Sequence, residues 1–117
     1  MTRHDETVRL THMLDASREA IELTKGKSQV ELSDSRVLTL ALARLLEIIG
    51  EAASRVERDL RERLPDIPWA AAVAMRNRII HGYESVDVDV VWATVRRDFP
   101  ELVEKIEGAL DKMNSSR

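Results

Sequence analysis

Apolar residues recur every three or four positions along most of this chain, and helix-breaking residues rarely interrupt them. Only three prolines and four glycines occur among the 117 residues. Apolar positions at this spacing lie on one side of an α-helix, whereas a strand needs strict alternation, which the chain does not show. The sequence therefore predicts an all-α fold, an antiparallel bundle of four or five helices in one domain spanning residues 1–117.

Capping and breaking residues divide the pattern into helices. The first helix is expected over about residues 5–25, with Gly26 at the position of a C-terminal cap. The longest is expected over residues 35–63, with N-cap candidates in Ser33-Asp34-Ser35 and an end at Pro65 and Pro68. Its apolar arc is wider than one neighbour would cover, which indicates burial against several elements, a second subunit among them. A short buried helix should follow from Trp69, which reads as a core residue.

Two more helices are expected in the C-terminal third. Asp87 or Asp89 should cap the first of them, and Phe99-Pro100 should end it. The last helix carries an apolar stripe that includes Leu102.

Composition excludes several classes of function. A net charge of −3 and only four aromatic residues argue against nucleic-acid binding by bulk positive charge or by base stacking. There is no cysteine, and the three histidines lie on different expected elements, so neither a metal site nor a cofactor is expected. His4 and His12 are interpreted as surface or interface residues of the first helix. Because no apolar run is long enough to span a membrane, a cytoplasmic protein is expected.

The segment over residues 76–83 carries the groups best suited to chemistry. Arg76 ends an apolar run, where a guanidinium needs a carboxylate or phosphate partner. His81 lies four residues after Asn77, on the same helical face. An imidazole can move protons to and from a ribose 2′-hydroxyl, and an arginine can stabilise charge on phosphoryl oxygens. The simpler alternative is that Arg76 and His81 only stabilise a helix C-terminus.

The arrangement Arg76-x4-His81-x-Tyr83 resembles the signature of the HEPN superfamily (higher eukaryotes and prokaryotes nucleotide-binding domain). More closely, the chain resembles HepT-like ribonuclease toxins of type VII toxin–antitoxin pairs. The similarity runs through five blocks in order, at residues 45–53, 67–69, 75–83, 86–92 and 98–102.

This resemblance implies a homodimer whose motif faces its symmetry mate across a cleft that receives RNA, with transfer RNA as the family-level expectation. Cleavage would be metal-independent, with Arg76 stabilising the transition state and His81 acting as general base or acid. Asn77 would orient the site, and two copies of Arg78 would add positive charge for RNA. The implied partner is a minimal nucleotidyltransferase antitoxin, which transfers AMP from ATP onto Tyr83 and so blocks the site.

The sequence departs from the family pattern after the motif tyrosine, where Glu84 and Ser85 replace a frequent aromatic residue. A carboxylate there would repel RNA phosphates and weaken intrinsic ribonuclease activity. Polar residues of the longest helix can approach the site in this superfamily, which makes Glu47 and Glu51 candidates. Their simpler role is in surface or interface ion pairs.

Two other interpretations remain open at this stage. One is a non-catalytic substrate-binding or regulatory subunit of a nucleotidyltransferase. The other is a structural dimer in which the motif only caps a helix.

Overall fold

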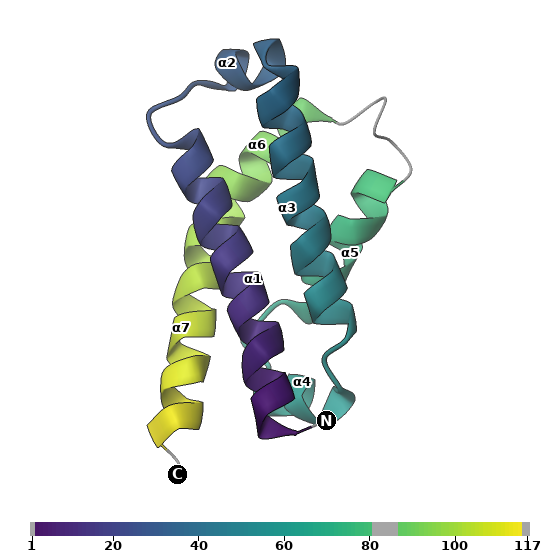
Figure 1. Cartoon of the computed structure of the whole chain (residues 1–117), viewed down its shortest axis with the longest axis vertical. Coiled ribbons are helices and arrows are strands. Elements are labelled where there is room, and N and C mark those ends of the chain that lie inside the picture. Colours follow the sequence, from purple (N-terminus) through teal and green to yellow (C-terminus); the bar gives the residue numbers. More distant parts are fainter. Residues whose placement is uncertain (1, 81–86, 116–117) are drawn as a thin grey trace.

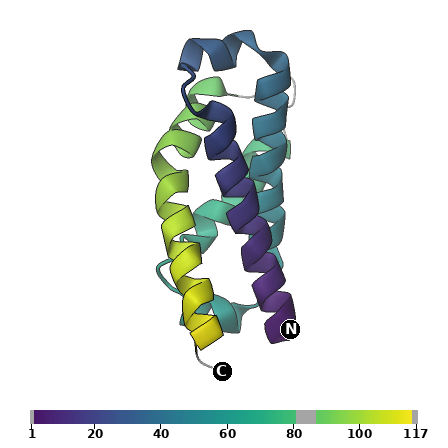
Figure 2. The ribbon, with the colours of Figure 1, turned by 60° about the vertical axis from the view of Figure 1, so that its left-hand side comes forward.

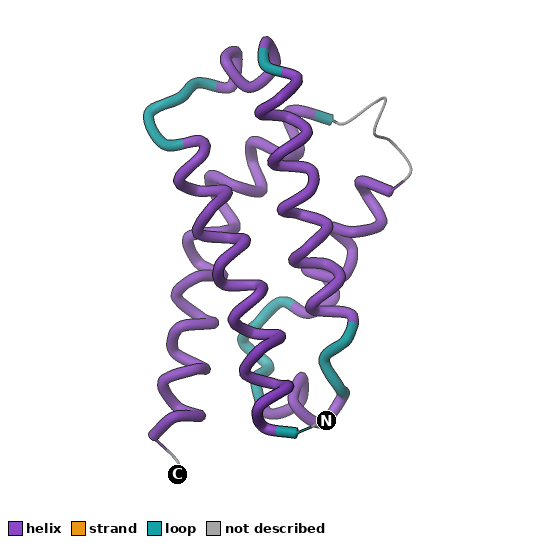
Figure 3. The backbone as a smooth tube through the Cα atoms, viewed as in Figure 1, coloured by secondary structure: helices purple, strands orange, loops and turns teal. Residues whose placement is uncertain are grey.

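A computed structural model of the protein describes residues 2–80 and 87–115, with residues 77–80 described as helical backbone only. Over this part the chain forms helices and loops without any strand, so the prediction of an all-α bundle is confirmed (Figure 3). In chain order the elements are α1 (Arg3–Thr24), α2 (Gln29–Asp34), α3 (Arg36–Ser54), α4 (Arg58–Arg63), α5 (Trp69–Ile80), α6 (Val88–Ala93), the π-helical segment η1 (Thr94–Asp98) and α7 (Phe99–Ser115).

The long helices lie side by side along the long axis of the molecule. Helix α1 packs against both α3 and α7, and α5 packs against α3 (Figure 1). The short helix α2 joins the upper ends of α1 and α3, and both chain ends lie at the opposite end of the bundle (Figure 2). The inward faces form one apolar core, whose largest fully buried side chains include Phe99, Leu10, Met13 and Leu42.

Three predicted boundary signals are confirmed by the local geometry. Gly26 follows α1 with a φ of 74°, a value that favours glycine. Ser35 caps α3, since its Oγ accepts a hydrogen bond from the Leu38 amide at 3.1 Å. Asp87 caps α6 by accepting from two amide groups of the first turn, so Asp87 rather than Asp89 is the cap.

Helix α1 begins earlier than predicted, because a capping box extends it by two residues. The Thr2 hydroxyl accepts from the Asp5 amide at 3.1 Å, and the Asp5 carboxylate accepts from the Thr2 amide at 3.2 Å. The hydrogen bonds with Thr2 hold the pKa of the exposed Asp5 carboxyl below its usual value.

The expectation of one continuous helix over residues 35–63 is wrong, because the structure divides this range into α3 and α4. Arg61 of α4 folds back on the end of α3. Its Nε donates to the Val56 carbonyl at 3.0 Å and its Nη2 donates to the Ala53 carbonyl at 2.9 Å. These bonds add a charged donor to carbonyl groups at the end of α3 and in the turn after it, so a contact from α4 stabilises the break between the two helices.

Replacing Arg61 by leucine should lower the free energy of unfolding by about 2–3 kcal/mol, since charged hydrogen bonds to two carbonyls are lost. The Arg61 guanidinium also lies 6.0 Å from the ring centroid of Trp69. Urea denaturation measures the change. Arg58→Leu is the matched control on the same helix, because Arg58 makes an exposed ion pair with Glu62 and should change stability by under about 0.5 kcal/mol. Equal effects of the two substitutions would contradict this role for Arg61.

The expected helix end at Phe99-Pro100 is also wrong, because α6, η1 and α7 follow one another without a loop. Proline lacks an amide hydrogen, and its ring clashes with the carbonyl four residues earlier in a regular α-helix. The π-helical turn of η1 directly precedes this proline and widens the helix there, so the chain passes Pro100 without stopping.

Helix α5 is buried on one face rather than all round, which corrects the expectation of a buried helix. Trp69, Ala72 and Met75 are buried, whereas Ala70 and Ala71 are exposed. The prediction of Trp69 as a core residue is confirmed, and its indole Nε1 donates to the Leu64 carbonyl at 2.9 Å.

Candidate functional site

Arg76 lies on α5 with its guanidinium directed at α3. Its Nη1 lies 3.4 Å from the Glu51 Oε1 and donates to the Ser54 Oγ at 3.2 Å. The sequence predicted that Arg76 needs a carboxylate or a phosphate, and Glu51 is that carboxylate. The Arg76 side chain keeps 29% of its surface exposed, so part of the guanidinium remains accessible to a second anion.

Glu51 and Ser54 form a supporting unit one turn apart on α3. The Ser54 hydroxyl donates to the Glu51 carbonyl at 2.8 Å, which leaves its oxygen lone pairs to accept from Arg76. The second carboxylate oxygen of Glu51 lies 3.9 Å from Arg55 Nη2. Glu51 therefore lies between two guanidinium groups, which restrict the position of its carboxylate.

The structure distinguishes the two acidic candidates of this helix. Glu51 contacts Arg76, whereas Glu47 pairs with Arg44 at 3.2 Å. Ser54 was not predicted as a site residue. Its position three residues after Glu51, on the same helical face, is the one sequence signal that could have indicated it.

Gly50 permits the close approach of α3 to α5 at Arg76. A Cβ atom at Gly50 would lie 2.5 Å from the Cβ of Arg76 and 2.8 Å from its backbone nitrogen, closer than real Cβ atoms come. The two helices therefore touch at Arg76, the residue that carries the candidate guanidinium. The sequence analysis did not identify Gly50 as functional, although a glycine inside an apolar helix often marks a close approach.

The structure describes the remaining motif residues only in part. Asn77 and Arg78 lie directly after Arg76 on α5, and the structure describes their backbone but not their side chains. His81 and Tyr83 lie outside the described residues, as do Glu84 and Ser85. Their predicted roles stay predictions.

A groove of about 410 Å³ lies between α1 and α3 beside the Glu51–Arg76 pair, and we call it the α1–α3 groove. Its lining residues are Arg9, His12, Arg44, Glu47, Ile48, Glu51, Ala52 and Arg55. Glu47 pairs with an exposed arginine, Arg44, but its own side chain is only 12% exposed. His12 is exposed, as predicted, and faces this groove.

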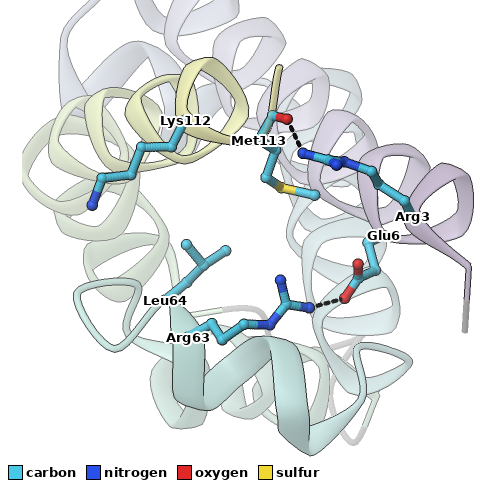
Figure 4. Close-up of a pocket in the computed structure, with 6 residues that line it drawn as sticks. All are labelled: Arg3, Glu6, Arg63, Leu64, Lys112 and Met113. Atoms are coloured by element: carbon cyan, nitrogen blue, oxygen red, sulfur yellow. Dashed lines mark hydrogen bonds and ion pairs between the residues drawn. The ribbon is translucent and has the colours of Figure 1, made fainter. Parts of the chain in front are cut away.

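A second hollow, of about 450 Å³, lies at the end of the bundle where the chain begins and ends (Figure 4). Arg63 pairs there with the buried carboxylate of Glu6 at 2.7 Å, and Arg3 donates to the Met113 carbonyl. Its described lining comes from α1, α7 and the end of α4, and no described residue of the Arg76 motif belongs to it. The hollow is therefore separate from the candidate site.

Two kinds of feature are absent from the part of the chain that the structure describes. No group of three or more His, Asp or Glu side chains among them is arranged to hold a metal ion. None of their helices combines the length and the apolar character needed to cross a membrane.

Comparison with known proteins assigns a family to this architecture. The chain matches the family described as "Ribonuclease HepT-like" over residues 13–109. It is 34% identical over 107 residues to a Methanocaldococcus jannaschii protein named "Putative RNase", covering 92% of this chain and 98% of that protein. A Caldanaerobacter subterraneus protein of the same name is 36% identical over 103 residues, which covers 88% of this chain and 92% of the relative.

A third relative bears the family's name directly. "Probable ribonuclease HepT" of Thermococcus cleftensis is 46% identical over 67 residues, covering 57% of this chain and 61% of the relative. Among solved structures, the comparison finds no match. The chain thus belongs to the HepT-like ribonuclease family.

Proposed function

We propose that this protein is a metal-independent endoribonuclease, the toxin of a toxin–antitoxin pair, that cleaves RNA with Arg76 and His81. The observation that carries the proposal is the Arg76 guanidinium, which Glu51 and Ser54 hold from one side while 29% of the side chain stays exposed. Family membership supports an action on RNA. A half-exposed, oriented arginine matches the need of phosphoryl chemistry for a fixed positive charge.

The proposed reaction uses the RNA's own 2′-hydroxyl as nucleophile. His81 takes the proton from this hydroxyl, the 2′-oxygen attacks the phosphorus, and the bond to the 5′-oxygen breaks. The leaving 5′-oxygen receives a proton from an imidazolium, which the second copy of His81 supplies in a homodimer. The products are a 2′,3′-cyclic phosphate and a 5′-hydroxyl. Arg76 stabilises the extra negative charge on the phosphoryl oxygens, and Asn77 orients the site.

In the protein without bound RNA, Glu51 serves as the anionic partner of Arg76. Glu51 is 44% exposed, so its attraction for the guanidinium is screened by water and does not bind Arg76 irreversibly. A phosphate approaching the exposed side of Arg76 adds a second anionic partner. Ser54 then keeps the guanidinium oriented while Glu51 and the phosphate share it.

Homodimerisation and inhibition belong to the same proposal. The exposed small residues Ala70 and Ala71 leave one face of α5 uncovered, which suits the close approach of a second copy. A minimal nucleotidyltransferase antitoxin would transfer AMP onto Tyr83. The added phosphate would bring negative charge to Arg76 and compete with RNA.

The test is RNA cleavage by the purified protein in excess EDTA. We expect transfer RNA or another structured RNA to be cleaved at an unchanged rate, with 2′,3′-cyclic phosphate ends, because no step uses a metal ion. Incubation with ATP and the transferase should add the mass of AMP to the wild-type protein but not to Tyr83→Phe. Loss of cleavage in EDTA would contradict the metal-independent mechanism. A stable complex with the transferase, without RNA cleavage in any buffer, would favour the regulatory-subunit alternative.

A further inference from the structure

The α1–α3 groove concentrates positive charge on a protein whose net charge is negative. Three arginines and His12 line it, against two carboxylates. With His12 neutral the lining carries one net positive charge, whereas the whole chain carries −3. A local excess of guanidinium groups on an acidic protein favours an anionic ligand at this place.

The arginines of the groove are not all neutralised by its carboxylates. Arg44 pairs with Glu47 at 3.2 Å, and Arg55 lies 3.9 Å from Glu51. Arg9 has no ion-pair partner among the described residues, and its buried Nε makes no hydrogen bond. A partly buried guanidinium without an anionic partner is costly, so Arg9 favours binding of an anion in the groove.

Glu51 connects the groove to Arg76, because Glu51 lines the groove and its Oε1 also contacts the Arg76 guanidinium. Along α3 the groove extends from Arg55 back to Arg44, a distance of about 16 Å at the helical rise per residue. A nucleic-acid strand held at Arg76 therefore meets further guanidinium groups along this helix.

We propose that the α1–α3 groove binds the phosphate backbone of the RNA next to the cleaved bond, through Arg9, Arg44 and Arg55. The inference rests on the proposed ribonuclease function and extends it to the part of the substrate that is not cut. Guanidinium groups bind phosphate oxygens without reading bases, so the groove adds affinity rather than sequence specificity. Glu47 opposes binding, because its carboxylate repels the same phosphates.

The lining favours RNA over a second copy of the chain. Only two of the lining residues, Ile48 and Ala52, are apolar. The buried centre of a subunit interface is depleted in charged residues, whereas this groove consists mainly of them. Its charge instead complements a phosphate backbone.

The experiment measures binding of a fluorescein-labelled 2′-O-methyl RNA of mixed sequence by fluorescence anisotropy at several salt concentrations. This RNA lacks the nucleophilic hydroxyl, so wild-type protein binds it without cutting it, and the result does not depend on catalysis. Arg9→Gln and Arg44→Gln should each weaken binding about fivefold at roughly 0.1 M salt, with a salt slope smaller by about 0.7, the values for one lost phosphate contact on a single strand. Glu47→Gln should tighten binding. Arg58→Gln removes an exposed, paired arginine outside the groove and should leave affinity and slope unchanged.

Several outcomes would overturn the inference. Unchanged affinity and salt slope in both Arg9→Gln and Arg44→Gln would exclude the groove as an RNA site even if the wild-type protein cleaves RNA. If these variants lose self-association in sedimentation while keeping RNA affinity, the groove is an interface between copies. If wild-type protein fails to bind the RNA at all, the groove proposal fails, and the cleavage assay in EDTA then decides the proposed function separately. Circular dichroism of each variant confirms that helical content is kept.

Discussion

Alanine at position 76 should reduce the rate of RNA cleavage by roughly 10²–10³-fold, the usual loss when one group that stabilises transition-state charge is removed. The variant should remain folded, because the Arg76 side chain is 29% exposed. Its partner Glu51 is 44% exposed, so water can solvate that carboxylate once the guanidinium is gone. Loss of such a partly exposed ion pair costs about 0–1 kcal/mol of stability. Single-turnover cleavage measures the rate, and urea denaturation measures the stability.

Two companion variants separate the charge of Arg76 from its geometry. Arg76→Lys keeps the charge, but one ammonium group cannot contact Glu51, Ser54 and a phosphate as a planar guanidinium can, so we expect an intermediate rate. Arg97→Ala removes an exposed arginine away from the site and should leave the rate unchanged. A folded Arg76→Ala protein that cleaves RNA at the wild-type rate would contradict the proposed role of Arg76.

The Gly50→Ala substitution should lower both the free energy of unfolding and the rate of RNA cleavage, although it adds only one methyl group. The new Cβ would lie 2.5 Å from the Cβ of Arg76, so α5 must move away from α3. Overpacking of this kind costs about 1–3 kcal/mol of stability. A displacement of about 1 Å at a catalytic group can lower the rate by roughly 10²-fold. The expected loss is in kcat, because Arg76 remains present but no longer lies in its position against Glu51 and Ser54.

The chain provides a matched control for this substitution. A Cβ at Gly108 of α7 meets no atom within 4 Å, and Gly108 is likewise inside a helix. Gly108→Ala should therefore raise the free energy of unfolding by about 0.5–1 kcal/mol, through the higher helix propensity of alanine, and leave cleavage unchanged. The two glycine-to-alanine substitutions should thus change the free energy of unfolding in opposite directions in the same denaturation assay. If Gly50→Ala is as stable and as active as Gly108→Ala, the contact does not position Arg76.

Features that depend on neighbouring residues in the sequence were predictable. Gly26, Ser35 and Asp87 act through their own backbone or through amides two or three residues away, so their types indicate the helix ends directly. The break between α3 and α4 was not predictable in this way. It depends on the hydrogen bonds from Arg61 to two carbonyl groups across a turn, and the spacing of apolar residues does not indicate these bonds.

In the candidate site, too, some features follow from the local sequence and others depend on how the helices pack. The need of Arg76 for an anionic partner follows from its place in an apolar row. Which acid provides the partner depends on how α3 and α5 cross, and Glu47 and Glu51 are equivalent until that crossing is known. Gly50 and Ser54 contact Arg76 where α3 and α5 cross, so their roles can be recognised only once both helices are positioned in the structure.

The contact between Gly50 and Arg76 also makes this point a pivot. When one rigid rod turns about its point of contact with another, atoms near the contact move least and atoms farther along move most. A small rotation of α5 on α3 would therefore leave Arg76 almost stationary while Ile80, about 6 Å farther along the helix, travels through a wider arc. If the angle between the two helices changes, the Gly50–Arg76 contact would keep the proposed phosphate-binding charge beside Glu51.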